Sequence, residues 1–102
     1  MTKADLTDTI ATGTGLTRTE TEAVINGFLY TVAEALKAGE RVDLRGFGVF
    51  EVRRRAARMA RNPRTNQEVP LEAHYAPAFR PSRDLRDAVA KALGPPPDEE
   101  GA

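Results

Sequence analysis

The chain has 102 residues, and its 15 lysines and arginines balance 15 aspartates and glutamates, so the totals alone disfavour a polyanionic partner such as nucleic acid. The length allows a single domain, and the absence of cysteine excludes disulfides, zinc–thiolate sites and thiol nucleophiles. No run approaches the roughly 20 apolar residues of a membrane span, and no apolar leader opens the chain, so a cytoplasmic protein without membrane contact is expected.

The start of the chain predicts a short helix. Thr2 is expected to cap it, with Asp5 in the first turn facing the positive end of the helix dipole. Leu6 and Ile10 form one apolar side, and the glycine-containing segment 12–15 is expected to break the helix.

A second, more apolar helix follows. Thr17 and Glu20 have the spacing of a capping box at its start, and Gly39 supplies the left-handed residue that ends it after about Ala38. Its apolar stripe is wider than a surface helix needs, so burial on two sides and therefore a dimer are expected. The stripe includes Phe28, Leu29, Val32 and Leu36.

The middle of the chain predicts strands. Residues 41–45 alternate polar and apolar side chains, which indicates a half-buried strand, and residues 46–48 form a tight turn into a second strand. That strand is expected to continue without a break to a turn over residues 62–66 and to pair with residues 67–73. These outer segments have almost nothing to bury, so they predict a projecting two-stranded ribbon whose ladder is incomplete at Pro70.

A third helix and a short tail complete the chain. Ser82 is expected to cap the helix, which turns Leu85, Val89 and Leu93 inward. Residues 94–102 are expected to form a disordered acidic tail. The predicted fold class is α+β: two N-terminal helices, an antiparallel β-sheet with an extended β-ribbon arm, and a C-terminal helix.

The neutral total hides an uneven distribution of charge. Residues 1–40 and 65–102 each carry a net charge of −3, whereas residues 41–64 carry eight arginines against two carboxylates, a net charge of +6. A charge run is usually a solvated surface, but a purely arginine run favours phosphate, which the guanidinium fork matches. An arginine ribbon fits a duplex groove, and Pro63 at its tip has the shape of a wedge that kinks DNA. From the spacing alone, a proline that merely forms the turn is an equally good interpretation.

Four motifs lie in one register along the chain. They are Gly-Phe-Gly-Val-Phe at 46–50, Arg-Ala-Ala-Arg at 55–58, Arg-Asn-Pro-Arg-Thr at 61–65 and Pro-Ala-Phe-Arg at 77–80. Together they resemble the bacterial histone-like HU and integration host factor family. The resemblance implies a DNA-binding domain over residues 1–93, an arm over about residues 53–75, and an intertwined homodimer or heterodimer. It further implies a nucleoid-associated architectural protein whose two arms embrace double-stranded DNA through the minor groove, largely without sequence preference, while a proline at each tip bends it.

The resemblance also assigns residues. It implies that Pro63 intercalates, that Arg61, Asn62, Arg64 and Thr65 surround it, and that Arg53, Arg55 and Arg58 line the arm. It implies that flanking phosphates are held from the body by Lys3, by the backbone near Gly46 and Gly48, and by Arg80, Arg83 and Arg86. The implied dimer core consists of Phe28, Leu29, Val32, Leu36, Leu44, Phe47, Phe50 and Phe79.

The chain departs from the usual family pattern in three respects. Asn66 stands where glycine is usual, Pro70 replaces an ordinary strand residue, and the chain is neutral where the family is usually basic. Asparagine tolerates a positive φ at small cost. The neutral charge predicts DNA held mainly by the arms, with weaker help from the body. With about three cations per arm, log K is expected to fall with log salt with a slope of about −5 to −6.

Two alternatives remain beside this interpretation. One is a dimeric protein–protein scaffold that keeps the fold and uses its arms on an acidic partner, and the other is DNA bridged or bound end-on without wrapping. An enzyme is not expected, nor are a cofactor, a metal or a small-molecule substrate. His74, the only histidine, has no carboxylate pair nearby, and residues 46–48 lack the glycine spacing and lysine of a phosphate-binding loop.

Overall fold

The computed structural model describes residues 1–97. Residues 98–102 of the predicted disordered acidic tail therefore lie outside the described residues. The elements are, in chain order, α1 (Lys3–Thr14), α2 (Arg18–Lys37), β1 (Val42–Leu44), β2 (Gly48–Arg55), β3 (Arg58–Arg61), β4 (Glu68–Leu71), β5 (His74–Pro81) and α3 (Arg83–Leu93). This order confirms the predicted α+β class. Among the described residues, none of the helices is both long and apolar enough to cross a membrane.

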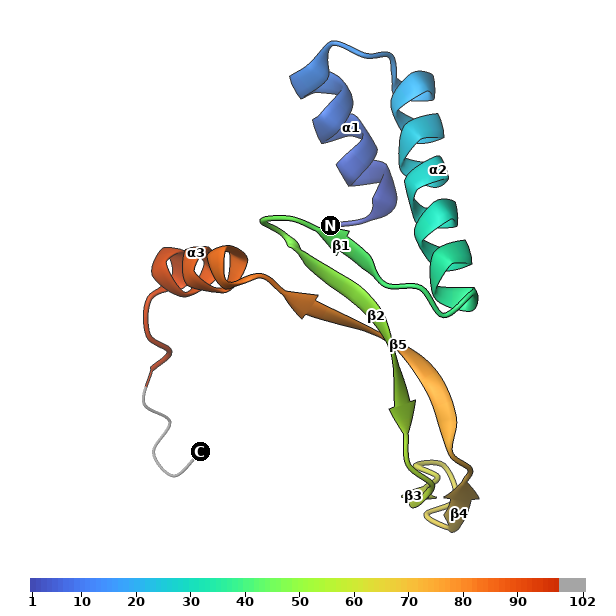
Figure 1. The fold of residues 1–102 in the computed structure, drawn as a ribbon. Helices are drawn as coiled ribbons and strands as arrows, with labels where there is room; N and C mark the ends of the chain where they lie inside the picture. The colour runs from blue at the N-terminus through green and yellow to red at the C-terminus, as the bar shows by residue number, and fades with distance from the viewer. Residues whose placement is uncertain (98–102) are drawn as a thin grey trace.

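Helices α1 and α2 pack side by side as a helical hairpin (Figure 1). Both predicted caps are confirmed, because the hydroxyls of Thr2 and Thr17 accept the amides of Asp5 and Glu20 at 3.2 and 3.0 Å. Each carboxylate in turn accepts the amide of its cap residue at 2.9 Å, which completes a capping box at each helix. Helix α1 continues almost to the end of the segment expected to break it and stops at Gly15, whose φ is 79°.

The strands form two antiparallel sheets instead of one continuous ribbon. Strands β1, β2 and β5 make a three-stranded sheet in the order β1–β2–β5, and β3 pairs with β4 at the end of the arm. The prediction of an uninterrupted second strand is therefore wrong. The ladder of backbone hydrogen bonds along the arm is broken at residues 56–57 and, on the returning side, at residues 72–73. Three of these four residues are alanines, whose side chains add little cross-strand packing. Pro70 does not break β4, where it lies opposite Met59.

Helix α3 leaves the sheet at the end of β5 and lies away from the helical hairpin (Figure 1). Ser82, its predicted cap, fixes the helix on the β1–β2 turn: its hydroxyl donates to the Gly46 carbonyl at 2.9 Å and its amide to the Phe47 carbonyl at 2.8 Å. The prediction that the apolar side of this helix points inward is wrong for Val89 and Leu93 in the single chain, whereas Leu85 is half-buried. Val89 and Leu93 are 49% and 80% exposed, since no other helix or strand within residues 1–97 covers them.

Residues 1–97 of a single chain do not build a hydrophobic core. Within residues 1–97 no hydrophobic side chain is buried, and the fully buried side chains there are Thr7 and Thr21, whose hydroxyls donate to carbonyls one turn back. The radius of gyration is 18.8 Å, whereas a compact domain of this length would have about 13 Å. The chain therefore leaves its apolar surfaces open.

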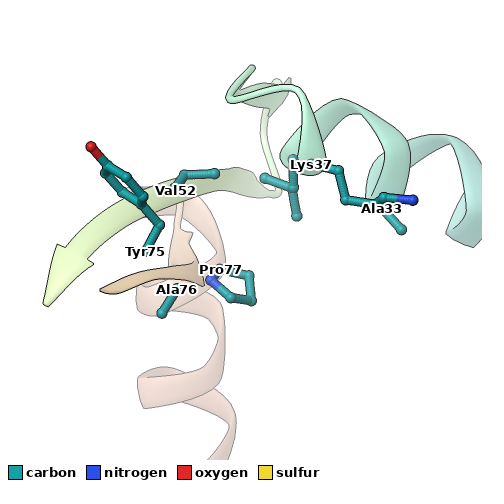
Figure 2. Close-up of a pocket in the computed structure, with 7 residues that line it drawn as sticks. Ala33, Lys37, Val52, Tyr75, Ala76 and Pro77 are labelled. Atoms are coloured by element: carbon teal, nitrogen blue, oxygen red, sulfur yellow. The ribbon is translucent and has the colours of Figure 1, made fainter. Parts of the chain in front are cut away.

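One of these open surfaces is an apolar groove between the end of α2 and the base of the arm (Figure 2). Val52 on β2 and Pro77 on β5 lie across from the α2 residues Ala33 and Lys37 in that view. The lining residues are Ala33, Leu36, Lys37, Val52, Tyr75, Ala76 and Pro77. Apolar walls of this kind indicate a surface that is covered in the working molecule.

Candidate nucleic-acid interface

The three-stranded sheet has a charged face, formed by Glu51, Arg53, Arg55 and Arg80. Alternate residues of a strand point to one side, so the three β2 residues share a face. Arg80 lies opposite Val49 in the β2–β5 register, which places it on the same face. Arg54 points to the other side. The two β2 arginines that the resemblance assigned to DNA are therefore the two on the charged face.

The other face of the sheet carries aromatic side chains. The Phe79 ring is central, with its centroid 4.9 Å from that of Phe50 and 5.4 Å from that of Phe47. Phe79 and Phe47 nevertheless remain 40% and 49% exposed. The residues expected to form a dimer core on this face are thus gathered together but only half covered by their own chain.

Gly48→Ala is expected to lower the free energy of unfolding by about 1–3 kcal/mol. An added Cβ would lie 2.6 Å from the Phe79 ring and 2.7 Å from the Arg80 carbonyl oxygen, so β2 and β5 would have to separate. Urea unfolding at a fixed protein concentration measures the change. The matched control is Gly13→Ala, at a helical position with open space around it. This substitution is expected to raise the free energy of unfolding by about 0.5–1 kcal/mol. Equal effects of the two substitutions would contradict the packing role of Gly48.

Ion pairs divide the arginines of the arm into two groups. Arg53 Nε lies 2.7 Å from Glu51 Oε2, and Arg61 Nη2 lies 3.6 Å from Glu68 Oε1. The predicted DNA-binding arginines of the arm that pair with no carboxylate in the described part of the chain are Arg55, Arg58 and Arg64. Each arm therefore offers three guanidinium groups to phosphate without first breaking an ion pair.

The turn at the arm tip, residues 62–66, is held by hydrogen bonds around Asn62. Its side-chain oxygen accepts the Arg64 amide at 2.9 Å, and its carbonyl accepts the Asn66 amide at 2.7 Å. Its own amide donates to the Gln67 carbonyl at 2.8 Å. Asn66 adopts a φ of 60°, which confirms the positive φ predicted there. Pro63 is exposed at the apex of this ordered turn.

Arg61 is bound to this turn. Its Nη1 donates to the carbonyl and side-chain oxygens of Asn66 at 3.0 and 3.2 Å, while its Nη2 lies near Glu68. In the free chain Arg61 therefore stabilises the tip, a role that the sequence interpretation missed. The signal was available, because Asn66 supplies a side-chain acceptor at a position where the resembling family usually has glycine.

Residues expected to hold phosphates from the body come together in a pocket at the start of α3, here called the body pocket. It is lined by Gly46, Gly48, Arg80, Ser82, Arg83 and Arg86, with Asp43, Leu44, Val49 and Pro81 completing the wall. The N-terminus of α3 adds the positive end of its dipole. Arg83 lies 3.7 Å from Asp87, whereas Arg86 has no ion pair within residues 1–97. Lys3 does not line this pocket, and its ammonium donates to Asn26 Oδ1 at 2.9 Å.

Two basic side chains of the helical hairpin are already neutralised. Arg18 lies 2.8 Å from Asp8 and 3.3 Å from Glu22, and Lys37 lies 2.7 Å from Glu34. The hairpin thus has little positive charge to offer flanking DNA, in contrast to the arm.

Comparison with known proteins decides the family. The profile described as bacterial DNA-binding protein matches residues 1–90. The chain belongs to the bacterial HU family. Its sequence is 45% identical over 89 residues to the SPbeta prophage-derived DNA-binding protein HU 2 of Bacillus subtilis (strain 168), covering 87% of this chain and 97% of that one. It is 44% identical over 91 residues to the DNA-binding protein HU of Thermus thermophilus, covering 89% and 94%.

Solved HU structures share the fold. The Anabaena HU–DNA cocrystal structure matches with a TM-score of 0.80 at 40% identity, covering 88% of this chain and 98% of that one. HU from Thermotoga maritima matches with a TM-score of 0.62 at 27% identity, covering 87% and 98%. The resemblance and the fold class predicted from the sequence are therefore confirmed.

Proposed function

We propose that two copies of this chain form a dimer whose arms hold double-stranded DNA in the minor groove and bend it by inserting Pro63 into a base step. As a member of the HU family, the protein is a histone-like architectural protein that binds and bends duplex DNA, and it is not an enzyme. The single observation that carries the proposed mode is the arm, a ribbon that presents Arg55, Arg58 and Arg64 without an ion pair among residues 1–97 and an exposed proline on an ordered tip.

The open apolar surfaces support the dimer. Phe28, Leu29, Phe47 and Phe79 are between 40% and 49% exposed in the single chain, more than a stable core permits. A second copy that covers them, together with the half-buried Val32, Leu36, Leu44 and Phe50, would supply the missing core. We propose residues 1–93 as the DNA-binding unit and a homodimer as the simplest assembly, with a heterodimer with another family member as the alternative.

The charge distribution supports contact through the arms. The negative potential of the minor groove attracts inserted arginine, and contacts of this kind read groove shape more than sequence. Arg55, Arg58 and Arg64 serve this role in each arm, and the body pocket with Arg86 holds a flanking phosphate. Binding that is largely independent of sequence fits a protein associated with the nucleoid in the cytoplasm.

A fluorescence-anisotropy titration of a short labelled duplex tests this function. At about 50 mM salt, where phosphate contacts are strong, the protein is expected to saturate the duplex at micromolar concentration or below. The matched variant Arg55→Ala/Arg58→Ala/Arg64→Ala should keep its circular dichroism spectrum and bind much more weakly. If the protein is instead a scaffold that uses its arms on an acidic protein, neither the parental protein nor the triple variant should bind the duplex. Straight bridged complexes on imaging would contradict the bending mode.

A further inference from the structure

Glu51 lies on the charged face between an arm arginine and a body arginine. Its Oε2 accepts a hydrogen bond from Arg53 Nε at 2.7 Å, and its Oε1 lies 3.4 Å from Arg80 Nη2. Arg53 belongs to the arm and Arg80 lines the body pocket. One carboxylate therefore binds a member of each group of expected phosphate ligands. Its side chain is only 20% exposed, so the two guanidinium groups and the sheet cover most of it.

The Glu51 carboxylate is charged at neutral pH. The hydrogen bond from Arg53 holds its pKa below the ordinary value, and the charges of Arg80 and Arg41 act in the same direction. A DNA phosphate needs the same guanidinium donors and is repelled by the carboxylate. Phosphate and Glu51 thus cannot both bind these arginines at full strength.

We propose that Glu51 competes internally with phosphate for Arg53 and Arg80 and thereby sets the affinity and salt dependence of DNA binding. This rests on the proposed function, since it concerns the same face of the protein. The opposite role would be to orient the two guanidinium groups toward DNA while leaving their outer donors free. The two roles predict opposite signs for the same substitution, which makes them separable.

Glu51→Gln removes the charge but keeps the shape and one acceptor. Competition predicts that it binds a short duplex about 3- to 20-fold more tightly at low salt, because one arginine pair in each subunit is released. The slope of log K against log salt should become steeper by about two if one of the two arginines in each subunit gains a phosphate contact and by about four if both do, at roughly 0.9 for each contact. Weaker binding by Glu51→Gln would overturn the competition and favour orientation.

Glu72→Gln is the matched charge control. Glu72 is an exposed carboxylate between β4 and β5, with no ion pair among the described residues. Its removal is expected to change the affinity less than about twofold, in line with an isolated surface charge. An equal gain from both substitutions would show that only net charge matters, which would overturn the specific role of Glu51.

A double-mutant cycle that combines Glu51→Gln with Arg53→Ala distinguishes competition from orientation independently. Competition predicts that Arg53→Ala weakens binding more in the Glu51→Gln background than in the parental protein, whereas orientation predicts a smaller loss. Unfolding midpoints check that each variant folds. If Glu51→Gln unfolds, NMR of the parental protein supplies the test. The Arg53 Nε resonance must shift when the protein is saturated with DNA, and an unchanged resonance would overturn the competition.

The two levels of the proposal fail differently. If neither the parental protein nor Glu51→Gln binds DNA, the proposed function is wrong, and so is the proposed role of Glu51. If the parental protein binds DNA and Glu51→Gln binds it equally or more weakly, only the role of Glu51 is overturned.

Discussion

Pro63→Ala is expected to reduce the DNA bend by tens of degrees while weakening binding less than about tenfold, because apolar wedges kink a duplex by about 20–90° whereas phosphate contacts supply most of the affinity. The hydrogen bonds of Asn62 keep the turn closed whether residue 63 is proline or alanine, since none of them uses the proline. Energy transfer between dyes at the two ends of a duplex measures the bend at saturating protein.

Arg64→Ala is the matched control at the neighbouring position. Arg64 has no ion pair in the described chain, and only its backbone amide takes part in the turn. Its loss should weaken binding and make the salt slope shallower by about two per dimer, at roughly 0.9 for each arm. The bend should persist. An unchanged bend with Pro63→Ala would remove the wedge role and leave a proline that only forms the turn.

Phe79→Ala is expected to destabilise each subunit by about 3–5 kcal/mol, the value for truncating a phenylalanine inside a core. In the single chain the Phe79 side chain is 40% exposed, so the substitution would destabilise an isolated chain much less. The full effect requires a second copy that covers it. The parental protein should accordingly show a thermal midpoint that rises with protein concentration, as expected for coupled folding and dimerisation.

Val69→Ala is the control for this experiment. Val69 lies on β4 in the arm and is 38% exposed, close to the value for Phe79. Truncating it should change stability by well under about 1 kcal/mol, as for an isolated surface position. A concentration-independent midpoint, together with a small effect of Phe79→Ala, would contradict the dimer.

Features that depend on neighbouring residues were predictable from the sequence. The Thr17–Glu20 capping box, the positive φ of Asn66 and the Ser82 cap each depend on residues within one turn of the chain, and all three are found in the structure. The arm as a whole was also predictable, because residues 53–75 carry arginines and little to bury.

Features that depend on pairing across the fold were not predictable. The break of the ladder at residues 56–57 reflects what faces those residues across the arm, which the pattern of a single strand does not contain. The engagement of Arg61 by Asn66 and of Arg80 by Glu51 likewise joins side chains from different strands or from the two ends of a turn. The resemblance placed Arg61 and Arg80 in the DNA interface, while the structure adds the internal partners with which phosphate must compete.

The salt dependence of binding tests most directly whether DNA is held by the arms. If Arg55, Arg58 and Arg64 of each arm each neutralise one phosphate, the arms alone contribute a slope of about −5 to −6 in log K against log salt. Arg55→Ala/Arg58→Ala/Arg64→Ala should abolish most of this slope, whereas Arg86→Ala in the body pocket should make it shallower by about two at most. A slope that survives the triple arm substitution but collapses with Arg86→Ala would show that the body, and not the arms, holds the DNA.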